Sequence, residues 1–170
     1  MSMPDLVTMI GNLGQSFISV QSFITGLGYL IGMALVVSGL YKCTKITTHS
    51  RERMSVPFAY ILGGAALIFL PTSIETLSAT LFGSTSALQY TEYNPYNIYS
   101  SMQVLIKTAG LVWFVRGTVL LVHAAKPGEQ HGPKGFAFVL AGIGAINIQY
   151  TFAWVDWFFT YIMNLLKGPI

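Results

Sequence analysis

The segments FAYILGGAA (Phe58–Ala66) and FAFVLAGIG (Phe136–Gly144) carry nearly the same residue types at each position. Each segment follows a loop that contains Lys or Arg, and each loop follows a long apolar run. This order predicts a helical hairpin in a membrane, built twice in one chain. It argues against a soluble enzyme before any motif is considered.

The composition agrees with a membrane protein. The chain is 53% hydrophobic and only 9% charged, whereas soluble domains carry about 25% charged residues. A length of 170 residues fits a single domain. The chain has one cysteine, Cys43, so it cannot form an internal disulfide.

The apolar runs define the expected spans, because a helix needs about 20 mostly apolar residues to cross the hydrocarbon layer. Four runs stand out, at 22–40, 56–70, 104–122 and 136–148. The second and fourth are short, so they must extend into flanking residues, tilt little or thin the bilayer locally. We therefore predict an all-α polytopic membrane protein with about four transmembrane helices in two tandem hairpins.

The chain then divides into three parts. Residues 1–83 hold the first hairpin and residues 102–170 the second, and a tyrosine-rich connector, 84–101, joins them. Basic residues gather in the hairpin loops, 41–55 and 124–135, and are absent before Lys42 and from 71–106. Positive charge marks the cytoplasmic side, so we expect both loops there, with both termini and the connector on the other side.

Amphipathic segments flank the spans. Residues 4–20 lack the basic start of a signal peptide, and we favour a separate interfacial helix over one continuous with the first span. Thr72 and Glu75 have the spacing of a capping box after the second span. Residues 151–166 predict a second interfacial helix, since Asp156 makes a fifth span costly.

Four charged residues are the candidates for a function inside the membrane: Arg116, Lys107, Glu75 and Asp156. Arg116 lies within the third apolar run, where a guanidinium must face protein, water or lipid headgroups. It either lines a conduit or pairs with an acid of another subunit. The structural alternative is an ion pair with Glu75 or Asp156 of the same chain.

Two further sets of residues predict contacts. Small residues in the spans permit close helix packing, within the chain or between neighbouring subunits; they are Gly28, Gly32, Gly63, Gly64 and Gly142. Tyrosine recurs at every third position of the connector, at Tyr90, Tyr93, Tyr96 and Tyr99. These rings form either an aromatic belt at the membrane boundary or a face for a partner.

Catalytic motifs are absent from the sequence. It contains no HExxH, GxSxG or Walker-type pattern, and its three histidines match no metal-binding spacing, so we expect loop histidines. We predict no enzymatic activity, no cofactor and no metal. The basic loops are too short for a nucleic-acid footprint, and membrane topology accounts for them.

Three segments resemble the DotE/IcmC family of type IVB (Dot/Icm) secretion systems, which is similar to TraQ of related conjugation systems. They are NPYNIYSSM at 94–102, TAGLVWFVRGTVLLVH at 108–123 and QHGPKG at 130–135, and the likeness begins near ITGLGY at 24–29. The resemblance implies a non-catalytic subunit of the bacterial inner membrane that contacts lipid and other inner-membrane subunits, and we expect a homo- or hetero-oligomer. Both termini would then be periplasmic, and ATP hydrolysis would belong to separate ATPases.

The resemblance leaves the subunit's role open. One hypothesis is a fixed part of the translocation channel or its scaffold. The rival is a pilin-like protomer that polymerises into a lipid-associated tube or ring, since related pilins resemble a single apolar hairpin with a basic loop. A small-solute transporter also uses repeats, but no interrupted span with polar ligands is evident.

Overall fold

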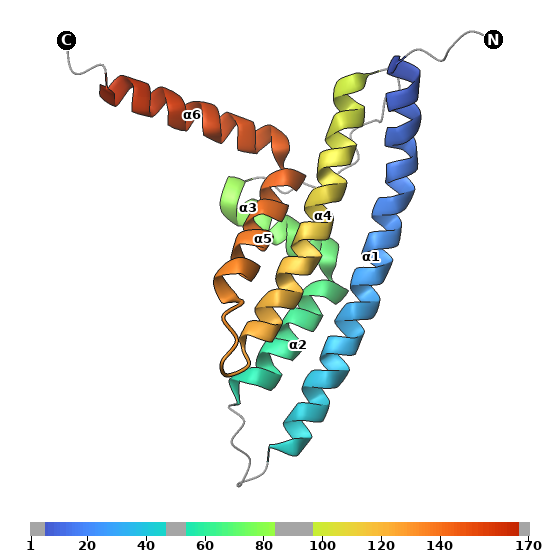
Figure 1. Ribbon diagram of the computed structural model, residues 1–170, viewed down its shortest axis with the longest axis vertical. Helices are drawn as coiled ribbons and strands as arrows, with labels where there is room; N and C mark the ends of the chain where they lie inside the picture. Colours follow the sequence, from blue (N-terminus) through green and yellow to red (C-terminus); the bar gives the residue numbers. More distant parts are fainter. Residues whose placement is uncertain (1–5, 47–53, 84–96, 167–170) are drawn as a thin grey trace.

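The computed structural model describes residues 6–46, 54–83 and 97–166, and within these ranges it is helical throughout apart from turns and short loops (Figure 1). The all-α prediction is therefore confirmed for the described residues. The helices are α1 (Leu6–Lys45), α2 (Ser55–Ile68), α3 (Leu70–Phe82), α4 (Ile98–Ala124), α5 (Gly132–Ile146) and α6 (Ile148–Leu166).

The described residues include two long helices, α1 and α4, that are apolar and long enough to cross a membrane. The remaining helices form two bent pairs, with 96° between α2 and α3 and 102° between α5 and α6. Two to four spans result, depending on whether each bent pair counts as one. At 1.5 Å per residue, α2 and α5 reach only about 21 and 22 Å, so each falls short of a hydrocarbon layer about 30 Å thick.

The first helix differs from the expectation. We favoured a separate interfacial helix over residues 4–20, but α1 runs without a break for 40 residues. A helix of that length extends about 60 Å. The prediction was wrong because the apolar positions of 6–17 also continue the face of the first span. No Pro interrupts the helix before Lys45, and Gly11 and Gly14 are helical.

Both bends have the same backbone geometry. The residue between α2 and α3 is Phe69, with φ −97° and ψ 42°, and the residue between α5 and α6 is Asn147, with φ −100° and ψ 42°. A hydroxyl bridges each bend: Ser73 Oγ donates to the Ala66 carbonyl at 3.0 Å, and Thr151 Oγ1 donates to the Gly144 carbonyl at 2.7 Å. These bonds partner a carbonyl that the break in the helix leaves free.

The expected capping box at Thr72 and Glu75 does not form. Helix α3 begins earlier, at Leu70, with Phe69 as its N-cap and Pro71 in its first turn, and no side chain caps it. Pro71 favours the first turn because its missing N–H needs no partner there. The helix ends at Gly83, whose φ of 70° lies in the left-handed region, where glycine carries no steric penalty.

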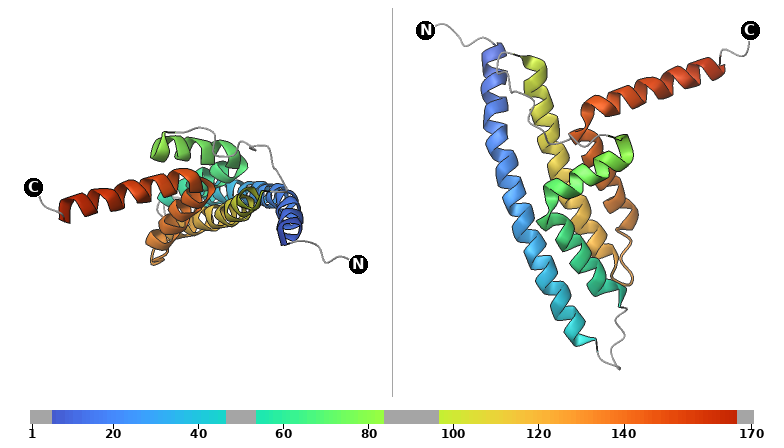
Figure 2. Two further views of the ribbon diagram at one scale, coloured as in Figure 1. Left: turned by 90° about the horizontal axis from the view of Figure 1, so that it is seen from above. Right: turned by 180° about the vertical axis from the view of Figure 1, so that it is seen from behind.

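The helices form two hairpins, which we call the first hairpin (α1 and α2) and the second hairpin (α4 and α5). Helix α4 is central: it packs against α5, against α1 and against α2, and Figure 2 shows it between α1 and α5 from above and from behind. The buried core lies along these contacts and includes Leu67, Leu70, Ile74, Phe114, Ile143 and Ile146. Helix α3 leaves the first hairpin beside the middle of α1, where Leu70 lies next to Gly28, and α6 leaves the second hairpin at Asn147. Helices α1 and α4 extend past both bends on the side away from the two basic loops (Figure 1).

The two hairpins are copies with a constant offset of 78 residues, as from Phe58 to Phe136. We call two residues related by this offset counterparts. Gly32 and Gly64 meet backbone to backbone, since a Cβ on Gly32 would lie 2.7 Å from the Gly64 carbonyl oxygen. Their counterparts Gly110 and Gly142 do the same, at 2.8 Å. The duplication therefore extends from the matching segments back into α1 and α4.

Candidate functional site

The contact between the two hairpins contains hydrogen bonds between buried polar groups. Gln21 of α1 is buried, and its Nε2 donates to Thr108 Oγ1 at 2.9 Å and to the Val104 carbonyl at 3.2 Å. Both partners lie on α4. Hydrogen bonds between helices stabilise membrane bundles because no water competes for the donor, so Gln21 fixes the register of α1 against α4.

Nearer the basic loops, small and aromatic residues complete this contact. Gly63 of α2 lies directly against Val122 of α4, and the Tyr60 ring lies 6.0 Å from the His123 ring, centroid to centroid. Gly28 of α1 faces the Val115 side chain. The second hairpin thus inserts α4 into a face that α1 and α2 build together.

Arg116 lies on α4, eight residues before its end at Ala124, or about 12 Å from it. Its guanidinium carbon stands 5.3 Å from the centroid of the Phe138 ring of α5, a cation–π contact. It also borders an apolar groove of about 360 Å³ between α1 and α4 that Ile24 and Val115 line. Among the described residues, neither Glu75 nor Asp156 forms the ion pair with Arg116 that the sequence left open.

The other charged candidates lie apart from Arg116. Lys107 is partly buried on α4, closer to the middle of that helix. Glu75 is partly buried on α3, and Asp156 is exposed on α6. These residues lie on α3, α4 and α6, and no ion pair joins any two of them among the described residues, so the four charges do not form one site there.

The glycines expected at helix contacts lie against other helices. A Cβ on Gly28 would approach Leu70 at 2.9 Å, and Gly63 and Gly64 face Val122 and Gly32. Gly142 faces Gly110. The sequence reasoning missed Gly39, Gly110, Gly117 and Gly135, which are equally crowded. Carrying Gly32 and Gly39 forward by the repeat offset would have found Gly110 and Gly117.

The tyrosines of the connector can be followed only in part. Tyr90, Tyr93 and Tyr96 lie outside the described residues. Tyr99 lies in the first turn of α4, where Asn97 caps the helix by accepting a hydrogen bond from the Tyr99 backbone N–H at 3.0 Å. Its side chain is 59% exposed. Residues 98–101, which we expected in the connector, therefore belong to α4.

Helix α6 has no buried residue, and it exposes a row of aromatic side chains. Its Trp157 and Tyr161 rings stack at 5.7 Å between centroids. A cavity of about 420 Å³ lies under its first turns, lined by Phe82 of α3, Leu140 of α5 and Trp154 of α6. Such a helix, leaving α5 at 102°, has the composition of one that lies at a membrane boundary.

The bend at Asn147 holds a second polar contact that the sequence did not reveal. Asn147 is buried, and its Nδ2 donates to Ser78 Oγ of α3 at 2.7 Å and to the Ile143 carbonyl at 2.9 Å. The contact joins the second bend to α3. A single polar residue in an apolar run was the available signal, and the counterpart position holds Phe69.

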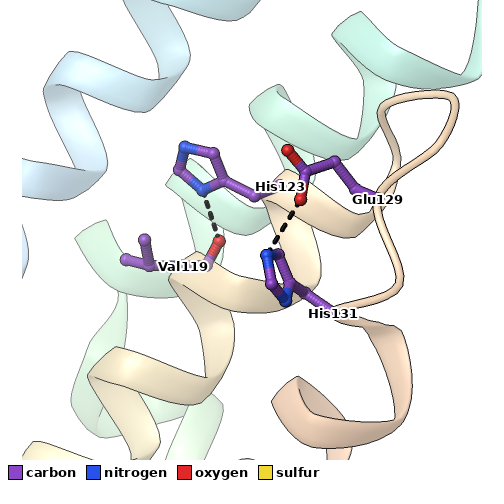
Figure 3. Close-up of polar contacts among 4 residues, drawn as sticks. All are labelled: Val119, His123, Glu129 and His131. Carbon is purple, nitrogen blue, oxygen red and sulfur yellow. Dashed lines mark hydrogen bonds and ion pairs between the residues drawn. The ribbon is translucent and has the colours of Figure 1, made fainter.

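The histidines of the second basic loop make local contacts (Figure 3). His123 bonds through Nδ1 to the Val119 carbonyl at 2.8 Å, and His131 Nε2 lies 2.9 Å from Glu129 Oε2. The His131–Glu129 pair is exposed, so it contributes little to stability. No group of metal-binding side chains occurs in the described ranges, and His49 lies outside them.

Comparisons with protein-family models, with curated proteins and with solved structures found no match for this chain.

Proposed function

We propose that the chain is a non-catalytic, structural subunit of a type IVB secretion or conjugation apparatus, part of its translocation channel or scaffold in the bacterial inner membrane. The resemblance of 94–102, 108–123 and 130–135 to the DotE/IcmC family is the basis for the apparatus. The observation that carries the proposal is the place of the 108–123 segment. It forms most of the central helix, α4, which contacts both helices of the first hairpin as well as α5.

The proposed topology follows from the charges. Each bent pair crosses the membrane once, loops 41–55 and 124–135 face the cytoplasm, and both termini are periplasmic. In support, α1 ends and α2 begins at the same end of the bundle at which α4 ends and α5 begins (Figure 1). The exposed aromatic side chains of α6 fit the periplasmic membrane surface. Lipid and other inner-membrane subunits are the partners.

Arg116 is the residue that we assign to the contact with a neighbouring subunit or with the translocation path. Its side chain is exposed and near the basic loops, where it can pair with an acidic residue of a neighbouring subunit or border a water-filled path. Its counterpart in the first hairpin is Ser38. Only the second copy therefore carries the charge, as expected of a feature that serves the function rather than the fold.

A pilin-like protomer is the second candidate, and the exposed apolar faces are compatible with it. Both hairpins present long exposed apolar faces, as on α1 at Phe23, Leu30 and Val37, and a polymer with ordered lipid would cover such faces. In that case the chain would leave the membrane and appear in extracellular filaments.

The test is deletion of the gene in a bacterium that carries the apparatus, followed by complementation. Deletion should abolish transfer of a secreted protein, and wild-type chain should restore it. Arg116→Ser should lower transfer about tenfold or more if it removes one partner of a charge pair, whereas Arg116→Lys should retain most of it. Transfer that is normal without the gene would refute the proposal, and chain found in sheared surface filaments would favour the pilin-like protomer.

A further inference from the structure

The two hairpins do not pack with two-fold symmetry. Helix α4 contacts both α1 and α2, but α5 packs to no comparable extent against either helix of the first hairpin. A two-fold axis would pair α5 with α1 as it pairs α2 with α4. The contact is therefore heterologous: the first hairpin offers one face and the second hairpin offers a different one.

A heterologous contact between two copies leaves one face of each copy unfilled. On the first hairpin, the face that receives α4 includes Gln21, Ile24, Gly28, Tyr60 and Gly63. The counterparts on the second hairpin form what we call the docking groove: Tyr99, Met102, Ile106, Phe138 and Ala141. All of these are exposed or partly exposed, and Met102 is 51% exposed.

The opposite side of the contact is unfilled as well. On α4, the side that enters the first hairpin includes Val104, Thr108, Val115, Thr118 and Val122. The counterparts on α1 form what we call the free α1 face: Gly26, Leu30, Val37, Leu40 and Thr44. Each of these residues is exposed, Leu30 at 61% and Val37 at 64%.

We propose that the docking groove binds the free α1 face of a second copy of this chain, in the arrangement in which the first hairpin holds α4. The internal contact supplies the template: its helices, depth and register are repeated between chains. The proposal does not require a role in secretion, and it goes beyond the proposed function by naming the interface.

The residues that differ between the copies are compatible with this docking. Tyr99 is larger than Gln21, but it would face Gly26, which is smaller than Val104 and has open space around it. Near the basic loops, Tyr60 contacts His123 within the chain. Their counterparts are Phe138 and Lys45, so in the proposed interface Phe138 would lie beside Lys45 of the second copy. A lysine ammonium is attracted to an aromatic face, so a cation–π contact would replace the ring–ring contact, on the face of Phe138 that Arg116 does not cover.

The bent helices leave room for the second copy. Helix α3 leaves the first hairpin through a bend of 96° without blocking α4, and α6 leaves the second hairpin through a nearly equal bend of 102°. By the same geometry, α6 clears the docking groove. Since each added copy presents a new groove, the assembly continues as a closed ring or an open filament.

Cysteine crosslinking in native membranes tests the interface, with Cys43→Ser in every variant. A Cβ on Gly63 would lie 3.6 Å from Val122 Cβ, within the Cβ–Cβ range of disulfides of about 3.5–4.5 Å. The counterparts of this pair are Ala141 and Thr44, so Thr44→Cys with Ala141→Cys should give a ladder of dimers, trimers and larger species. The intramolecular reference, Gly63→Cys with Val122→Cys, should close within one chain.

The control on the same helix is Ser38→Cys with Ala141→Cys, because Ser38 is exposed but lies about 9 Å from Thr44 along α1 and about 120° away around it. It should remain monomeric. When differently tagged chains carrying only Thr44→Cys or only Ala141→Cys are expressed together, dimers should contain both tags, and neither chain alone should dimerise.

Four results would overturn the proposal. If the test pair stays monomeric while the reference closes, lipid or another protein covers these faces. An equal ladder from the Ser38 control would indicate a different interface, and so would a single-cysteine chain that dimerises alone. If the reference pair formed no disulfide within one chain, the contact between the two hairpins, on which the proposal is based by analogy, would be wrong.

Discussion

The two hairpins share a backbone and differ in their surfaces. Gly32 meets Gly64 in the first hairpin as Gly110 meets Gly142 in the second, and the bends at Phe69 and Asn147 have nearly equal dihedral angles. The copies diverge where their surroundings differ, as at Ser38 and its counterpart Arg116. Backbone contact thus limits change at the crossing points, whereas the outer faces have been free to take separate roles.

The largest expected effect tests the shared backbone. A side chain at Gly64 or Gly142 would strike a carbonyl oxygen at 2.7 or 2.8 Å, so Gly64→Leu and Gly142→Leu should each lower the free energy of unfolding by about 3 kcal/mol. Gly26→Leu is the matched control, because a Cβ there meets nothing within 4 Å. SDS-induced unfolding in detergent micelles, followed by circular dichroism, measures the three variants.

A large difference between the two core variants would break the comparison. If Gly142→Leu unfolded like the wild type while Gly64→Leu did not, the second hairpin would lack the close crossing that the repeat implies. Equal losses would show that both copies depend on it.

The sequence was informative where a pattern repeats. The matching segments at Phe58 and Phe136 indicated two hairpins with short return helices, and α2 and α5 lie there. Crowded glycines could be named where they fell in a visible small-residue pattern, as at Gly28 and Gly32. Gly110 and Gly117 were missed because the 78-residue offset was not applied to Gly32 and Gly39.

What the sequence could not predict depends on contacts between distant residues. Gln21 bonds to Thr108, 87 positions along the chain, and Asn147 bonds to Ser78, 69 positions away. Neither partner is marked by local spacing. The continuity of α1 was misjudged for a related reason: whether residues 6–20 lie flat or extend the helix depends on the α4 surface beside them.

A medium effect should separate the two bends. Asn147→Ala would leave the buried Ser78 hydroxyl without its 2.7 Å donor, so the free energy of unfolding should fall by about 1–3 kcal/mol. Phe69 is 64% exposed, and Phe69→Ala should change it by about 0.5 kcal/mol or less in micelles. Equal losses in the same unfolding assay would mean that the polar contact between the second bend and α3 adds nothing.

The smallest effect concerns the contact between the hairpins. Gln21→Leu should cost about 1 kcal/mol, because hydrogen bonds between helices in membranes have modest net values. Its exposed counterpart gives the control: Tyr99→Leu should leave the unfolding of the monomer unchanged. A double-mutant cycle with Thr108→Val isolates the bond, since the pair should show a coupling of about 0.6–1.7 kcal/mol. Additive losses would assign the stability of this contact to helix packing alone, and Gln21 would then specify register without stabilising the bundle.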